Sequence, residues 1–230
     1  MILEDRKAKI LNAAIESFIT RGEPVSSQWL YDHYRFGIKP AMIRHELEAL
    51  TEEGYLMQPY HSAGRIPADK GFELFAHWTL EAESPPQIDK ELHTLLEDKA
   101  WEPFLKELAD ELGVLGVLGN ERGEVAKKGL ECLVEHFAWE TPEEIQRLVR
   151  DFVELDERVG AIIEEWTGDP LQIFIGRRSP VTRSEGLAVV MGKYQIPDGE
   201  VVVCTIGPKR MNYRRVIQVM KSIGEIHNDD

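Results

Sequence analysis

The sequence has little cysteine and no long apolar run. Its two cysteines, Cys132 and Cys204, do not form a Cys-x-x-Cys pair. Isolated thiols of this kind indicate buried structural residues in a reducing compartment rather than a metal or redox centre. No apolar segment reaches the roughly 18 residues that a membrane helix requires. Charged residues follow Met1 closely, so we expect a cytoplasmic protein with no signal peptide and no membrane contact.

Motifs for catalysis, phosphate binding and metal binding are also missing from the sequence. It contains no glycine-rich phosphate loop, no nucleophile elbow and no His-Glu-x-x-His motif. The histidines show no ligand spacing, and the many carboxylates follow predicted helix faces as solvated charge. We therefore expect a protein that is not an enzyme and that has no cofactor and no metal.

The net charge of −14 is distributed unevenly along the 230 residues. Residues 1–80 contain 9 Lys or Arg and 11 Asp or Glu, and residues 81–170 contain 9 and 24. Residues 171–230 contain 9 and 6. Because salt screens charges more than about 10 Å apart, an acidic middle does not prevent a basic patch elsewhere from binding nucleic acid.

The most informative pattern is a helix followed by a hairpin. Pro40 stands where a first-turn proline is tolerated, and Ile43, Leu47 and Leu50 recur at helical spacing. Gly54 is placed to end the helix in a left-handed conformation. The next residues, up to residue 67, contain basic side chains and no carboxylate. The pattern is typical of a recognition helix and the wing that follows it.

Two arginines are the principal candidates for contacts with DNA. Arg44 lies near the start of this helix, where the outward side lacks carboxylates, although pairing with Glu48 is the alternative. Arg65 follows the turn signal at residues 62–64, which predicts that it lies at the hairpin tip, although folding back onto the domain is its alternative. The predicted DNA-binding residues are Lys39, Ala41, Met42, Arg44, His45, His61, Ser62, Arg65 and Lys70.

The segment from Gly54 to Gly71 resembles the winged-helix segment of the HrcA family of bacterial heat-inducible transcription repressors. Residues 22–26 and 39–45 match that family too, and residues 207–213 match it closely. The resemblance implies an α+β fold. A winged helix-turn-helix DNA-binding domain would occupy residues 1–83. An acidic helical region and a reduced GAF-like α/β domain with a small sheet, serving dimerisation and regulation, would occupy residues 84–230. The proline-rich residues 84–86 are the predicted linker.

The resemblance also implies a function. It predicts a repressor of heat-shock and chaperone genes that binds an inverted-repeat operator in double-stranded DNA as a homodimer, with support from the chaperonin GroEL. The inserted dimerisation domain usual in the family would have only residues 113–123 available. Two alternatives remain open: a winged-helix protein that acts mainly through protein–protein interaction, and a small-molecule-responsive regulator of other genes.

Local patterns predict the remaining elements. In the N-terminal part, three helices precede Gly54 and a fourth follows the hairpin. Residues 114–118 could form either a strand or a buried turn. Residues 207–211 could form either an anion-binding site or a tight turn, and the tight turn is favoured. The other predicted helices are 88–112, interrupted near Pro103, 124–137, 142–167 and 211–226, and the predicted strands are 171–175, 186–191 and 201–206.

Overall fold

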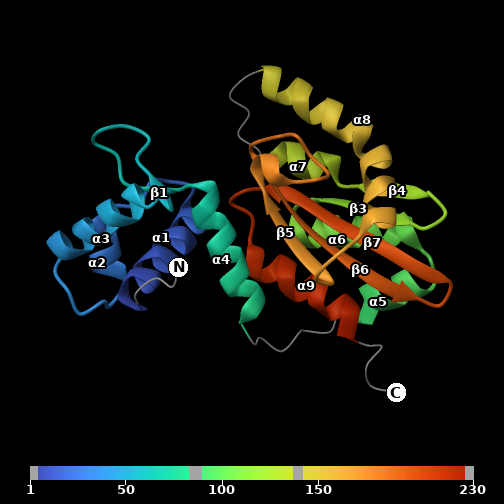
Figure 1. Ribbon diagram of the computed structural model, residues 1–230, viewed down its shortest axis with the longest axis horizontal. Coiled ribbons are helices and arrows are strands. Elements are labelled where there is room, and N and C mark those ends of the chain that lie inside the picture. Colours follow the sequence, from blue (N-terminus) through green and yellow to red (C-terminus); the bar gives the residue numbers. More distant parts are fainter. Residues whose placement is uncertain (1–4, 83–89, 137–141, 226–230) are drawn as a thin grey trace. The chain divides into compact units, whose positions relative to one another are not determined.

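The computed structural model describes residues 5–82, 90–136 and 142–225, and the chain divides into two compact units, Met1–Trp78 and Thr79–Asp230 (Figure 1). Buried apolar side chains occur in both units. The boundary predicted between residues 83 and 84, together with the linker predicted at residues 84–86, lies outside the described residues.

The first unit consists of helices and one short hairpin, as the sequence predicts. Its elements are α1 (Asp5–Arg21), α2 (Ser27–His33), α3 (Pro40–Glu52), β1 (Leu56–Met57), β2 (Ile66–Pro67) and α4 (Asp69–Glu81), whose last turn extends beyond Trp78. The apolar faces of α1, α2 and α3 form a common core. Its fully buried side chains include Ile10, Ile15, Leu30, Ile43 and Leu50.

Capping residues determine where these helices begin and end. Ser26 precedes α2, and its side chain accepts a hydrogen bond of 3.1 Å from the amide of Trp29. Gly54 follows α3 with a φ of +78°. The Gly54 amide donates to the carbonyl of Thr51 and the Tyr55 amide to that of Leu50, which is the bonding pattern of a Schellman motif. The stop signal predicted at Gly54 is therefore confirmed.

The second unit contains a five-stranded antiparallel sheet in the order β4-β3-β7-β6-β5. Its strands are β3 (Leu115–Asn120), β4 (Val125–Lys128), β5 (Leu171–Ile175), β6 (Leu187–Ile196) and β7 (Gly199–Pro208). Its helices are α5 (Lys90–Glu97), α6 (Trp101–Leu112), α7 (Leu130–His136), α8 (Pro142–Glu165) and α9 (Tyr213–Glu225), with a short 3-10 turn η1 (Gly176–Arg178) (Figure 1). The mixed helix and sheet content agrees with the predicted class.

Helices pack on both faces of this sheet. On one face, α7 and α8 cover alternate strand residues such as Val117, Val189 and Cys204. On the other face, the hydroxyl of Tyr194 donates to the carbonyl of Met220 in α9, and α6 packs on β3 and β4. Because both faces are covered, β6 and β7 are nearly continuous apolar runs. Among the described residues, no helix is both long enough and apolar enough to cross a membrane.

The structure corrects two predicted elements. The helix predicted for residues 124–137 is a strand, β4, followed by the shorter helix α7, because Gly123 has a φ of +78° and turns the chain back along β3. The helix break predicted near Pro103 lies at residues 98–100 instead. Pro103 is in the first turn of α6, where its missing N–H would have no helical partner. Residues 114–118 lie mainly in strand β3, and residues 113–123 form β3 and the turn into β4.

Candidate nucleic-acid interface

Helix α3 presents one apolar side and one exposed side. Ile43, Leu47 and Leu50 are buried against the first unit, as their spacing predicts. The residues exposed around the first turns are Lys39, Ala41, Met42, Arg44 and His45. Helix α3 begins at Pro40, and its first turn contains no acidic residue. This start of the helix can therefore approach a polyanion.

Two of the acidic residues near the end of α3 are ion-paired with α1. The Arg6 guanidinium lies 2.7 Å from a carboxylate oxygen of Glu46, whose side chain is only 9% exposed. The Lys7 ammonium lies 2.7 Å from Glu53. Both carboxylates thus have a cationic partner on another helix of the same unit, which lowers the negative field near the exposed side of α3.

Arg44 forms an ion pair with Glu48, which is the alternative to a DNA contact that the sequence also allows. Its Nε donates to a carboxylate oxygen of Glu48 at 3.1 Å, one helical turn away. The Arg44 side chain is nevertheless 74% exposed. An exposed pair at this spacing stabilises a helix by only about 0.3–0.5 kcal/mol, so a phosphate can displace the carboxylate.

The loop between β1 and β2 is closed by its own polar contacts. The side-chain amide of Gln58 donates to the carbonyls of His61 and Ala63, at 2.9 and 3.0 Å. Gly64 lies against the backbone of Val25, where an added Cβ would be only 2.6 Å away. The tip of the loop is therefore fixed from both sides, and it exposes His61 and Ser62.

The placement of Arg65 at the hairpin tip is wrong. Arg65 directly precedes β2, and its backbone forms two hydrogen bonds of 2.8 Å with Val25. Its Nε donates to the hydroxyl of Thr51 on α3 at 3.0 Å. The tight turn lies earlier, where the Ala63 amide donates to the carbonyl of Tyr60, so Arg65 is at the base of the loop and half-buried.

Lys70 lies at the C-terminal end of α3, away from the candidates on the first turns of that helix. Its ammonium donates to the carbonyl of Glu53 at 2.8 Å and lies 4.0 Å from the centre of the Tyr55 ring. A cation at the carbonyl end of a helix satisfies acceptors that the helix leaves unpaired. This contact accounts for Lys70 as a helix-capping residue.

Four of the predicted residues line one cleft. Its volume is about 440 Å³, and Arg44, His61, Ser62 and Arg65 contribute to its wall. The sequence prediction missed other lining residues, among them Ser26, Ser27 and Gln58. Ser26 was recognisable only as a helix cap, because its place beside the loop depends on the long-range pairing of Val25 with Arg65. The remaining lining residues are Val25, Leu47, Glu48, Ala63 and Gly64.

Comparison with known proteins identifies the family. A family model described as the HrcA protein C terminal domain matches residues 73–217, which is more than half of the chain. The chain belongs to the HrcA family. This result confirms the family that the helix and hairpin sequence resembles.

Curated relatives that match part of the chain are named heat-inducible transcription repressor HrcA. The relative from Frankia casuarinae is 49% identical over 74 residues, which cover 32% of this chain and 22% of that protein. The relative from Alkaliphilus metalliredigens is 45% identical over 91 residues, which cover 40% of this chain and 26% of that protein. The chain thus spans only about a quarter of the length of these HrcA proteins.

One solved structure has the same fold over nearly the whole chain. It is described as a hypothetical protein at 2.2 Å resolution, and it has a TM-score of 0.80 with 19% sequence identity. The alignment covers 96% of both chains. At this identity the likeness supports the fold alone.

Proposed function

We propose that this chain is a DNA-binding transcriptional repressor whose first unit is a winged helix-turn-helix domain. In this proposal α2 and α3 form the helix-turn-helix, and the loop between β1 and β2 is the wing. The observation that carries the proposal is that Arg44 from α3 and Arg65 beside the loop line the same cleft. The names of the HrcA relatives support the same role.

Helix α3 is the proposed recognition helix. Its first turns enter the major groove, where Ala41, Met42 and His45 meet base edges and Arg44 exchanges Glu48 for a phosphate or a guanine. His61 and Ser62 at the loop tip contact the adjacent backbone or the minor groove. Arg65 holds the base of the loop against α3 and offers the rest of its guanidinium to the same cleft.

We propose that the repressor is a homodimer formed by the second unit. Ile145, Val149 and Val153 follow one another at four-residue intervals along α8, and they are 45%, 53% and 68% exposed. Two copies of α8 can pack in antiparallel orientation across a two-fold axis, so that these three side chains of one copy contact the same three of the other. Two symmetric reading heads then bind an inverted repeat with half-sites separated by whole helical turns.

Substitution of Val149 by Glu tests the dimer. Sedimentation equilibrium should show that Val149→Glu is monomeric, because a charge in the middle of the row would be buried without a partner. Ala161→Glu places the same charge on an exposed position of α8 that lies about three turns beyond Val149 and about 120° around the helix from it, and it should remain dimeric. A dimer in both variants would place the interface elsewhere.

The proposed targets are heat-shock and chaperone genes, with the chaperonin GroEL supporting repression in the cytoplasm. The mechanism needs binding alone, so we propose no enzymatic activity and no cofactor. Within residues 5–82, 90–136 and 142–225, no three His, Cys, Asp or Glu side chains are grouped so that they could hold a metal ion. Heat is proposed to release the operator by loosening the second unit and with it the dimer.

Selection of bound duplexes from a random pool tests the proposal directly. The full chain should enrich an inverted repeat, and Arg44→Ala should weaken binding to that duplex by about fivefold or more, because one good base contact contributes about 1–3 kcal/mol. Lys9→Ala is the matched control because Lys9 also forms an exposed ion pair one turn away, with Asp5 on α1. It should leave binding unchanged.

Arg65→Ala completes the test, with circular dichroism to confirm that the first unit is folded. Failure to enrich any duplex, or unchanged binding in both Arg44→Ala and Arg65→Ala, would reject the proposed docking. A salt titration separates DNA binding from the alternative of a protein partner. DNA affinity should decrease by about half a decade per phosphate contact between about 50 and 200 mM salt.

A further inference from the structure

Arginine-rich segments lie at one end of the sheet in the second unit, where Arg215 pairs with Glu111 of α6. Two segments meet there: residues 176–186 connect β5 to β6, and residues 207–215 comprise the end of β7, the turn after it and the first residues of α9. The β6–β7 pairing places Leu187 opposite Pro208, and the amide of Lys209 donates to the carbonyl of Gly186 at 3.1 Å. These two segments contain seven Lys or Arg residues and one acidic residue, Glu185, in a chain whose net charge is −14.

Five arginines of these segments are exposed. The Arg177 side chain is 77% exposed, and it forms a surface ion pair with Glu185. We call the exposed arginines the basic end of the sheet, and they are Arg177, Arg178, Arg183, Arg210 and Arg214. Arginine presents a planar set of donors that matches phosphate oxygens in pairs, which lysine cannot do.

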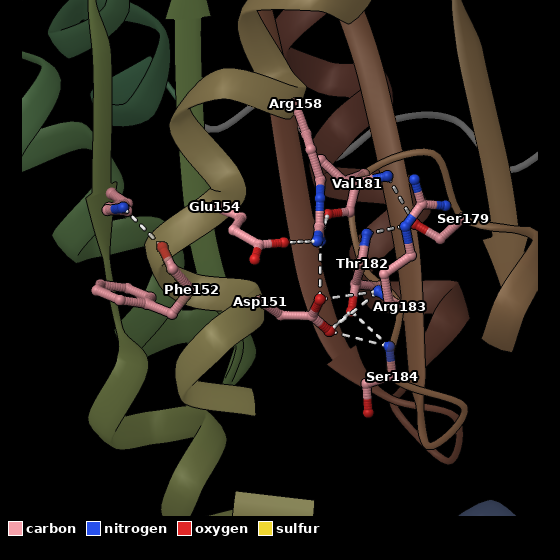
Figure 2. A network of polar contacts seen from close by, with 10 residues as sticks. Asp151, Phe152, Glu154, Arg158, Ser179, Val181, Thr182, Arg183 and Ser184 are labelled. Carbon is pink, nitrogen blue, oxygen red and sulfur yellow. Dashed lines mark hydrogen bonds and ion pairs between the residues drawn. The ribbon is translucent and has the colours of Figure 1, made fainter. Parts of the chain in front are cut away.

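A buried carboxylate fixes the longer segment in place. Asp151 of α8, only 7% exposed, accepts hydrogen bonds from the amides of Arg183 and Ser184 at 2.9–3.0 Å and from the hydroxyl of Thr182 (Figure 2). Arg158, two turns further along α8, donates to Asp151 at 2.8 Å and to the carbonyl of Val181 at 2.9 Å (Figure 2).

A second set of bonds within the segment removes further freedom. The hydroxyl oxygen of Ser179 accepts from the amides of Val181 and Thr182, both at 3.1 Å. Ser179 and Thr182 are each only 1% exposed. The segment is thus a rigid support, so binding through its arginines loses little backbone entropy.

We propose that the basic end is a second contact surface for the phosphodiester backbone of duplex DNA. This inference rests on the proposed function. The first unit is more acidic than basic in sequence, and the cations that line its cleft are Arg44 and Arg65. Its cleft therefore supplies few phosphate contacts. A rigid set of arginines on the other unit of the same chain adds the missing sequence-independent affinity.

The double variant Arg183→Gln/Arg214→Gln tests this surface in the full-length chain. Each phosphate contact is worth about fivefold in affinity at about 0.15 M salt, so two lost contacts should weaken binding to a random-sequence duplex about 25-fold. The slope of log affinity against log salt should become shallower by about 2. Fluorescence anisotropy with a labelled duplex measures both quantities.

Lys106→Gln/Arg122→Gln is the matched control. Both residues are exposed, both belong to the second unit, and Arg122 lies in the β3–β4 turn at the opposite end of the sheet. The control removes the same charge and should change the salt slope by far less. Circular dichroism melting curves of both double variants confirm that they are folded.

The outcomes separate this inference from the proposed function. If the unsubstituted chain binds no duplex, the proposed function fails and this inference with it. If the unsubstituted chain binds but Arg183→Gln/Arg214→Gln keeps its affinity and slope, only the second surface is rejected. Loss of self-association with an unchanged slope would also overturn it, because the basic end would then meet the acidic surface of a second copy.

Discussion

Replacement of Asp151 by Asn should destabilise the second unit strongly. The substitution keeps the shape of the side chain but removes the charge that pairs with Arg158. It also replaces a carboxylate oxygen with an NH₂ group, which cannot accept a hydrogen bond from donors such as the Arg183 amide. Asp151 and Arg158 are 7% and 15% exposed, so solvent screens their interaction little. Removal of one partner from a buried pair costs about 3–5 kcal/mol, and the lower end of this range applies because Glu154 still pairs with Arg158.

This loss corresponds to a large shift in melting temperature. For a domain of about 150 residues, 1 kcal/mol shifts the midpoint by about 2–4 °C, so Asp151→Asn should melt at least about 6 °C lower. Differential scanning calorimetry of the full chain measures the transition of the second unit. The control Asp156→Asn makes the same change five residues away on α8.

The two variants should differ because Asp156 is exposed. Its carboxylate pairs with Lys127 at 2.8 Å but is itself 54% exposed, so its loss should cost less than about 1 kcal/mol. A double-mutant cycle with Arg158→Met then isolates the ion pair, with an expected coupling of about 1–3 kcal/mol. Equal melting temperatures for Asp151→Asn and Asp156→Asn would refute the structural role given to this network.

Three further predictions concern single residues. Glu48→Gln removes the carboxylate beside Arg44, so anisotropy should show about threefold tighter binding to a random duplex, from roughly 0.7 kcal/mol of lost repulsion at about 6 Å. Gly160→Ala should increase the free energy of unfolding by roughly 0.5–1 kcal/mol and so raise the melting temperature, because Gly160 lies inside α8 and an added Cβ meets no atom within 4 Å. Burial raises the pKa of Cys204 from 9.0 to about 12. The contribution of this thiol to the free energy of unfolding should therefore be fully present below about pH 9. It should decrease between about pH 9 and 12, because the thiol ionises more easily in the unfolded chain. Thiol reagents should therefore label half-buried Cys132 before Cys204.

The helices of the first unit were predictable because each begins or ends at a residue with a local function. Ser26 caps α2 with its own side chain, and Pro40 starts α3. Gly54 ends α3 in a conformation that other residues adopt only with strain. These signals act within a few residues, so the sequence contains them in full.

Contacts between distant segments were not predictable in the same way. The local pattern of residues 124–137 predicts a helix, whereas the pairing of β4 with β3 depends on the turn at Gly123. Arg65 was placed at the loop tip because nothing nearby in sequence indicates its bonds to Val25 and Thr51. Asp151 did leave a signal. It stands between Leu148 and Leu155 on the buried side of α8, where a carboxylate requires partners.

The charge distribution explains how an acidic chain can present a surface to DNA. Glu46 and Glu53 lie on the side of α3 that faces α1, and Arg6 and Lys7 neutralise them at 2.7 Å. Most of the remaining negative charge belongs to residues 81–170, and salt screens charges beyond about 8 Å under physiological conditions. The field at the cleft therefore depends on the few groups that line it, among which Glu48 is the one carboxylate. A single ion pair between Arg44 and Glu48 then sets how strongly this cleft attracts a phosphate, which makes the net charge of the chain a poor guide to its binding.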